Sequence, residues 1–276
     1  MKKFDLAVLN TPEGRLRLLS SVMLAPVFIA VVCLGHASYS GLIMLLTGVG
    51  LYEWFKLVDP EVPDLDRYGM FGAHVFALLL AACGLIMFGF IVVVMATVAF
   101  YAHRSNETDA KPAFWFAFGL PYMAISGISL IYLRGLPDVG FQITLFLLAA
   151  VWGMDIGAYA VGRIVGGPKL APAISPNKTW SGFCGGLVLA WLLCLIVMLV
   201  YGAQSIFSGM VVALLLGAVA QAGDLFKSFF KRRANVKDSG NLIPGHGGIL
   251  DRVDGLVFSA VFFAFLNDIF GDHFIW

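Results

Sequence analysis

Runs of about twenty apolar residues dominate the chain, and a water-soluble fold of this length could not bury them all. Of the 276 residues, 60% are hydrophobic and 13% are charged, whereas soluble domains average about 25% charged residues. A helix needs about 20 apolar residues to cross a bilayer. We therefore predict an all-α, polytopic integral membrane protein that forms a single membrane domain over 1–276. This composition argues against a soluble enzyme, a disordered chain and a nucleic-acid partner.

One apolar stretch decides the number of spans. Gly69 to Ala102 covers 34 residues and would form a helix about 51 Å long, whereas the hydrocarbon core is about 30 Å thick. We expect two helices there, with a turn near Gly84 or Gly89, and about nine transmembrane helices in all. The other seven are predicted near 18–35, 38–57, 113–133, 139–162, 181–201, 206–223 and 255–275.

The distribution of charge predicts the orientation. With nine spans, 17 of the 18 Lys and Arg residues fall on one side of the membrane, and only Arg134 falls on the other. A single span over 69–102 would divide them 11 to 7. Because basic loops remain in the cytoplasm, we predict a cytoplasmic N-terminus and an external C-terminus. Spans 1–5 then occupy 1–135 and spans 6–9 occupy 139–276, with cytoplasmic loops at 163–180 and 224–254.

Asp155 is a carboxylate within an apolar span, where charge is costly and usually functional. It shares one helix face with Tyr159 and Arg163 by i, i+4, i+8 spacing. A structural hydrogen bond or ion pair, for example to Arg163, is the alternative to a role in a site. Glu53 in the second span is similar but solitary, and a structural role is favoured for it.

A second polar group, Ser175-Pro-Asn177-Lys178-Thr-Trp180, opens a later span. Backbone N–H groups at a helix start attract anions, and Lys178 adds a positive charge. Ordinary helix capping with an interfacial lysine explains the same residues equally well.

The third polar group combines acids with bases at two helix ends. One helix carries a stripe at i, i+3, i+4, i+7 spacing, and Asp251 and Asp254 begin the last span. A Gly-rich loop lies between them. Carboxylates suit Mg²⁺, while Lys and Arg neutralise phosphoryl oxygens. A basic run alone would be explained as a lipid anchor, but the acids and the loop favour a metal–phosphate site. The stripe comprises Asp224, Lys227, Ser228 and Lys231.

These residues resemble the signature of the phosphatidate cytidylyltransferases, also called CDP-diacylglycerol synthases. Supporting matches are Asp155-x-Gly-Ala-Tyr, Ser175-Pro-Asn-Lys-Thr-Trp and Gly223-Asp224, so that the resemblance covers roughly 150–255. The main run is Ser228-Phe-Phe-Lys231-Arg232-x4-Lys237-Asp238-x-Gly240-x-x-Ile243-Pro244-x-His246-Gly247-Gly248-x-x-Asp251-Arg252-x-Asp254.

The resemblance implies an enzyme that converts CTP and phosphatidate to CDP-diacylglycerol and pyrophosphate. It implies a multi-pass protein of the cell inner membrane, commonly a homodimer in contact with membrane lipid, whose active site faces the cytoplasm. It also implies Mg²⁺ and a second cation such as K⁺. By motif, Asp224 and Asp251 would be the principal metal ligands, with Asp254 beside them. Spans 6–9 would be the catalytic helices.

The chemistry of this reaction suggests further roles. Lys178, Lys231 and Arg232 are expected to act in catalysis on the phosphates, together with the two principal acids. His246 is expected to position phosphate rather than act as a base, because the phosphatidate nucleophile is already ionised. The expected substrate-binding residues are Asp155, Ser175, Asn177, Lys227, Ser228, Lys237, His246, Gly247, Gly248 and Arg252.

Four other functions remain open at this stage. A secondary transporter would explain a membrane carboxylate and Gly-broken helices, but the polar residues gather at one face and no repeat is visible. A CTP-using lipid kinase would transfer the γ-phosphate instead. A CDP-alcohol phosphotransferase would need the motif Asp-Gly-x2-Ala-Arg, which is absent. A non-catalytic lipid-binding scaffold would leave the signature unexplained.

Overall fold

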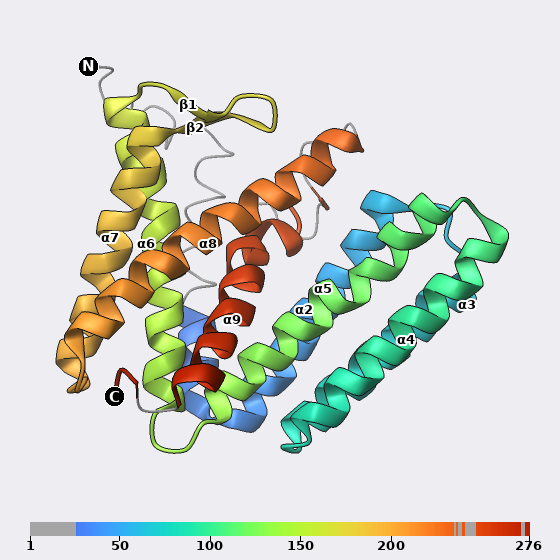
Figure 1. Ribbon diagram of the computed structural model, residues 1–276, viewed down its shortest axis with the longest axis horizontal. Helices are drawn as coiled ribbons and strands as arrows, with labels where there is room; N and C mark the ends of the chain where they lie inside the picture. Colours follow the sequence, from blue (N-terminus) through green and yellow to red (C-terminus); the bar gives the residue numbers. More distant parts are fainter. Residues whose placement is uncertain (1–25, 235, 237–238, 241–246, 272–273) are drawn as a thin grey trace.

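The structure, a computed structural model, describes residues 26–234, 236, 239–240, 247–271 and 274–276. Within these residues it is almost entirely helical (Figure 1). Residues 26–34 are helical, and the earlier part of the first predicted span lies outside the described residues. The long helices are α2 (His36–Val58), α3 (Asp64–Ala82), α4 (Ile86–Glu107), α5 (Ala110–Gly135), α6 (Gly140–Val165), α7 (Trp180–Val200), α8 (Ile206–Arg233) and α9 (Leu250–Phe270).

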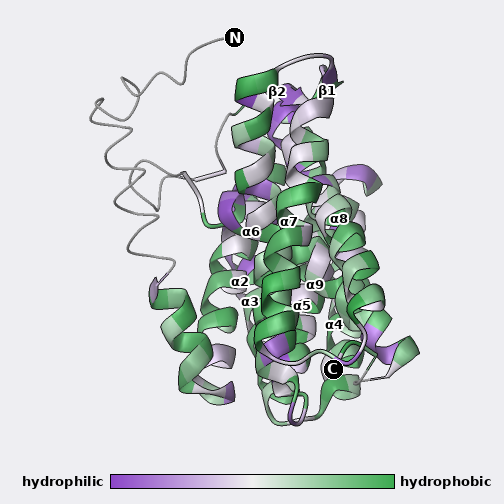
Figure 2. Cartoon of the chain, turned by 90° about the vertical axis from the view of Figure 1, so that its left-hand side faces the viewer, coloured by the Kyte–Doolittle hydropathy of each residue, from purple (hydrophilic) through white to green (hydrophobic). Residues whose placement is uncertain are grey.

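Seven of the described helices, α2 and α4–α9, are long and apolar enough to cross a membrane. In α3, the charged residues Asp64, Asp66 and Arg67 occupy the first turn. Figure 2 shows helices that are hydrophobic over most of their length, with hydrophilic segments around the two short strands. The prediction of an all-helical polytopic membrane protein is confirmed, while the count of nine spans and the orientation stay predictions.

The long apolar stretch does divide into two helices. The α3 helix ends at Ala82 and α4 begins at Ile86. Gly84 lies in the turn with φ +83°, which favours a residue without a side chain. Gly89 lies instead inside α4, where a Cβ atom would approach the Ala77 carbonyl oxygen to 2.8 Å. The turn predicted near Gly84 is therefore confirmed, and Gly89 serves the close packing of α3 against α4.

The predicted loop 163–180 contains an exception to the all-α prediction. Strands β1 (Lys169–Ala171) and β2 (Ser175–Thr179) pair antiparallel between α6 and α7. The Thr179 hydroxyl then caps α7 by accepting from the Gly182 N–H at 3.1 Å. The Arg232 Nε group donates to the Ile174 carbonyl oxygen at 3.2 Å, which ties the hairpin to α8.

The α8 helix is longer than the predicted span 206–223, since it continues to Arg233. The first part of the predicted cytoplasmic loop 224–254 is therefore helical. The polar stripe that begins at Asp224 lies on this helix, as its i, i+3, i+4, i+7 spacing predicted.

Small residues bring α6 and α7 into close contact. A Cβ atom on Gly153 would lie 2.6 Å from the Ala190 Cα atom, and one on Gly157 would lie 2.6 Å from the Gly185 carbonyl oxygen. Glycine at these positions permits the approach of the two backbones.

An aromatic cluster packs the N-terminal helices against α8 and α9. The Trp54 ring of α2 lies 4.8 Å from the Phe230 ring of α8, centroid to centroid. Tyr122 of α5 contacts Phe226 of α8 at 5.6 Å and Phe258 of α9 at 6.1 Å. Aromatic pairs of this kind stabilise a core beyond the burial of their area. The cluster fixes the position of α8 and α9 relative to α2.

Candidate active site

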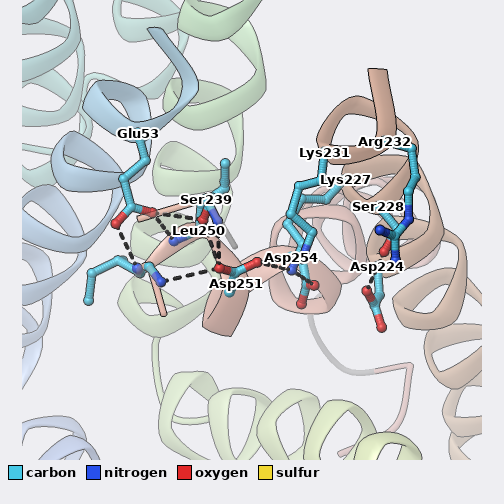
Figure 3. A network of polar contacts seen from close by, with 12 residues as sticks. Glu53, Asp224, Lys227, Ser228, Lys231, Arg232, Ser239, Leu250, Asp251 and Asp254 are labelled. Carbon is cyan, nitrogen blue, oxygen red and sulfur yellow. Dashed lines mark hydrogen bonds and ion pairs between the residues drawn. The ribbon is translucent and has the colours of Figure 1, made fainter. Parts of the chain in front are cut away.

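Acidic and basic side chains converge where α8 crosses the start of α9 (Figure 3). Gly223 permits this crossing, because a Cβ atom there would approach the Asp254 carbonyl oxygen to 2.5 Å. The stripe on α8 then faces Asp251 and Asp254 on α9. The two predicted halves of the metal–phosphate site are thus adjacent in space.

Lys227 is the central cation of this group. Its side chain is 2% exposed, and its ammonium group pairs with Asp254 and, at 3.0 Å, with Asp251 Oδ1. Lys231 approaches the same Asp251 oxygen at 2.8 Å. Because a buried charge is costly without partners, the acids and lysines of α8 and α9 stabilise one another.

The second oxygen of Asp251 is held by the backbone. Its Oδ2 accepts from the Ser239 N–H at 2.9 Å, from the Ser239 hydroxyl at 3.0 Å and from the Gly248 N–H at 3.2 Å. Lys227 and Lys231 thus hold one oxygen of Asp251, and Ser239 and Gly248 hold the other.

Asp224 lies on the other side of Lys227. Its Oδ2 pairs with Lys178 of β2 at 2.5 Å, and its Oδ1 accepts from the Ser228 hydroxyl at 3.3 Å. The carboxyl groups of Asp224 and Asp254 interact electrostatically. Asp155 of α6 is exposed. It interacts electrostatically with the acids Asp224 and Asp254 and with the lysines Lys178 and Lys227. Three helices and the hairpin thus contribute charge to one place.

Other predicted residues lie at the edge of this group or beyond it. Arg163 donates to the Tyr159 hydroxyl at 2.6 Å, which confirms the shared helix face. Arg232 binds the hairpin backbone. Asn177 and Arg252 are exposed, and Ser175 pairs in register with Ala171 in the hairpin. The predicted positions Lys237 and His246 lie outside the described residues.

Glu53 is a residue of the site that sequence reasoning treated as solitary. It is 3% exposed. It accepts hydrogen bonds from the Ser239 hydroxyl and from the backbone N–H groups of Ile249 and Leu250 at the start of α9. No spacing rule could reveal these contacts, because the partners lie 186 to 197 positions along the chain. The only signal in the sequence was a carboxylate within an apolar run.

The donor set fits a hard cation. Asp224 and Asp254 present adjacent carboxylates, and adjacent anions favour a cation that lies between them. Oxygen ligands of this kind suit Mg²⁺. The described residues also bring Asp66, His103 and Glu107 close enough to share one ion. There Arg104 approaches both carboxylates, at 3.9 and 3.2 Å, as the lysines do at the acids of α9.

A cavity of about 540 Å³ adjoins the charged group, between the ends of α2, α5 and α8. Trp115 and Phe230 form aromatic walls, while Lys56 and Arg233 contribute positive charge. Ser239 lines the cavity and also binds Asp251. Ligand pockets commonly have this size and this mixture of aromatic and polar walls.

The fold and the site define the class of protein: a multi-pass membrane protein with carboxylates and lysines gathered at the ends of its last helices. The chain belongs to the cytidylyltransferase family, whose sequence profile matches residues 15–270. This match extends the resemblance seen in 150–255 to most of the chain.

Curated relatives carry a more specific name. A phosphatidate cytidylyltransferase of Brucella suis is 38% identical over 262 residues, which cover 93% of this chain and 94% of that protein. The phosphatidate cytidylyltransferase of Bacillus subtilis is 33% identical over 264 residues, covering 92% and 97%. A third, from Staphylococcus saprophyticus, is 43% identical over 143 residues, covering 51% and 55%.

Proposed function

We propose that this protein is a phosphatidate cytidylyltransferase, which converts CTP and phosphatidate to CDP-diacylglycerol and pyrophosphate. The observation that carries the proposal is the match to phosphatidate cytidylyltransferases along more than nine-tenths of the chain. The acids and lysines at the crossing of α8 and α9 support it, because both substrates are anionic phosphates.

In the proposed reaction a phosphate oxygen of phosphatidate attacks the α-phosphorus of CTP. A new P–O bond forms, and the bond from the α-phosphorus to the bridging oxygen breaks, so that pyrophosphate leaves. An anion must approach a polyanion, and positioning with charge neutralisation therefore supplies most of the catalysis. Lys178, Lys227, Lys231 and Arg232 are proposed to bind phosphate oxygens in place of their present partners.

Asp224 and Asp251, with Asp254 beside them, are proposed to hold Mg²⁺. When bound, Mg²⁺ would neutralise phosphate oxygens in the transition state. A second cation such as K⁺ is proposed near it. Lys227 and Lys231 now balance the charge of Asp251, and their transfer to substrate phosphates would leave this carboxylate available to a metal.

Substrate access favours a particular location. Phosphatidate keeps its acyl chains in the bilayer and its phosphate at the interface, whereas CTP is soluble. The ends of membrane helices α8 and α9 can meet both. We propose a homodimer in the inner membrane, with about nine spans, an external C-terminus and the site facing the cytoplasm.

The deciding experiment is incubation of the purified protein with phosphatidate, Mg²⁺ and CTP labelled at the α-phosphorus. Appearance of the label in the lipid phase, with release of pyrophosphate, is the expected result. A lipid kinase would transfer the unlabelled γ-phosphate, and a transporter or a scaffold would transfer no phosphate at all. In each of these cases no label would enter the lipid phase, and that outcome would overturn the proposal.

A further inference from the structure

We infer that Glu53 of α2 is a positioning residue for the reaction proposed above, because it fixes the start of α9 and, through Ser239, the carboxylate of Asp251. This inference rests on the proposed function for its kinetic readout and on the proposed Mg²⁺ site at Asp251 for both readouts. The geometry that carries it is a chain of hydrogen bonds from one half of the molecule to the other (Figure 3).

Glu53 acts as the cap that α9 lacks in its own sequence. The first N–H groups of a helix have no partner within the helix, and no side chain at the N-cap position of α9 supplies one. Glu53 Oε1 accepts from the Ile249 N–H at 3.0 Å, and Oε2 accepts from the Leu250 N–H at 2.8 Å. A carboxylate is also favoured at a helix N-terminus by the helix dipole.

Ser239 connects this cap to the charged group. Its hydroxyl lies 3.2 Å from Glu53 Oε2 and 3.0 Å from Asp251 Oδ2. The single hydroxyl proton can serve only one of these carboxylates at a time. The Ser239 N–H also donates to Asp251, whichever carboxylate the hydroxyl serves. If Ser239 moved away from Glu53, its contacts with Asp251 would therefore be displaced as well.

The neighbouring backbone is shaped around Glu53. A Cβ atom on Gly240 would lie 2.6 Å from Glu53 Oε1, and one on Gly248 would collide with Oε2. Among the described residues no Lys or Arg forms an ion pair with Glu53, and hydrogen bonds from Ser239, Ile249 and Leu250 satisfy this buried carboxylate. Such a network is costly when only partly satisfied.

The informative substitution is Glu53→Gln, which preserves size but leaves one acceptor oxygen. In either orientation the side-chain NH₂ group would face a backbone N–H of α9, that of Ile249 or that of Leu250, and two donors repel each other. Substitution of a residue that orients a metal ligand typically lowers metal affinity or activity about 10–100-fold. We expect the Mg²⁺ concentration for half-maximal activity to rise by about tenfold or more.

A second readout does not depend on turnover. Mg²⁺ that binds the folded protein raises the midpoint of thermal unfolding. We expect this Mg²⁺-dependent rise to shrink in Glu53→Gln, measured on purified protein without CTP or lipid. Ser239→Ala, which removes the link and leaves both backbone bonds of Glu53, is expected to show the same loss. The double variant should lose less than the sum of the two single effects.

Thr47→Val provides the matched control. Thr47 lies on the same helix, is buried, and contacts His74 of α3 at 3.0 Å without reaching α9. This variant should lower thermal stability and keep the wild-type Mg²⁺ dependence.

A Glu53→Gln protein that matches Thr47→Val, with lowered stability and an unchanged Mg²⁺ response, would overturn the inference and leave Glu53 as a structural cap. If Glu53→Gln fails to fold, Ser239→Ala decides alone, and a wild-type Mg²⁺ response there overturns the inference. Absence of lipid product in the wild type would instead refute the proposed function, while the unfolding measurement still tests Glu53.

Discussion

At the scale of single residues, Asp251 has the highest density of contacts in the site. It receives two lysines on one oxygen and three hydrogen bonds on the other. In Asp251→Asn, an NH₂ group would replace one of the two oxygens. It would face either the two lysines or the N–H groups of Ser239 and Gly248, which are donors themselves. We expect the turnover number to fall by about 100-fold or more, measured in membranes with CTP, phosphatidate and Mg²⁺.

The control for this variant is Asp268→Asn, which removes an exposed carboxylate from the opposite end of the same helix. It should leave turnover unchanged. Near-normal, Mg²⁺-dependent turnover in Asp251→Asn would contradict the assignment of this residue to the metal.

Lys227 and Lys231 should differ in their contribution to stability. Lys227 is almost fully buried between two carboxylates, whereas Lys231 is more exposed and, among the described residues, forms an ion pair with Asp251. Loss of one member of a buried ion pair typically costs about 3–5 kcal/mol. We expect Lys227→Met to lower the unfolding midpoint of the purified protein far more than Lys231→Met does. Equal effects would show that burial does not govern these pairs.

At the scale of elements, the hairpin of β1 and β2 contributes a lysine to a group whose other described acids and lysines lie on helices. Lys178 of β2 binds Asp224, and Arg232 holds the hairpin backbone against α8. We expect Lys178→Met to lower kcat/KM for CTP about tenfold or more, as for a lost charge contact with a transferring phosphate.

The matched control is Lys169→Met on β1, an exposed lysine of the same hairpin. It removes the same charge from the same element and should leave kcat/KM unchanged. Similar losses in both variants would point to a general effect of positive charge and would contradict a specific role for Lys178.

At the scale of the whole molecule, features that depend on local sequence pattern were predicted, whereas contacts between residues distant in sequence were missed. The apolar runs predicted the helices, and the length of 69–102 predicted the α3–α4 turn. The spacing of the stripe on α8 predicted its meeting with acids from α9. The hairpin was missed because its strands span only three and five residues. Glu53 was missed because its partners are distant in sequence.

The orientation in the membrane is open to a direct test, because the chain contains its own reporter. Cys83 is an exposed free cysteine at the α3–α4 turn, which the nine-span topology places outside. In a background with Cys33, Cys184 and Cys194 replaced by Ser, we expect a membrane-impermeant maleimide to label Cys83 in intact cells. The positive-inside distribution is the physical reason, since it fixes the basic α8–α9 end in the cytoplasm.

The control places a cysteine beyond the other end of α4, at the start of α5. Lys111 is exposed at the start of α5, and the same topology places it in the cytoplasm. With Cys83 also replaced by Ser, Lys111→Cys should react only after the membrane is permeabilised. The reverse pattern would put the acids and lysines of α8 and α9 outside, away from cytoplasmic CTP. It would therefore count against the orientation and against the proposed access of substrate together.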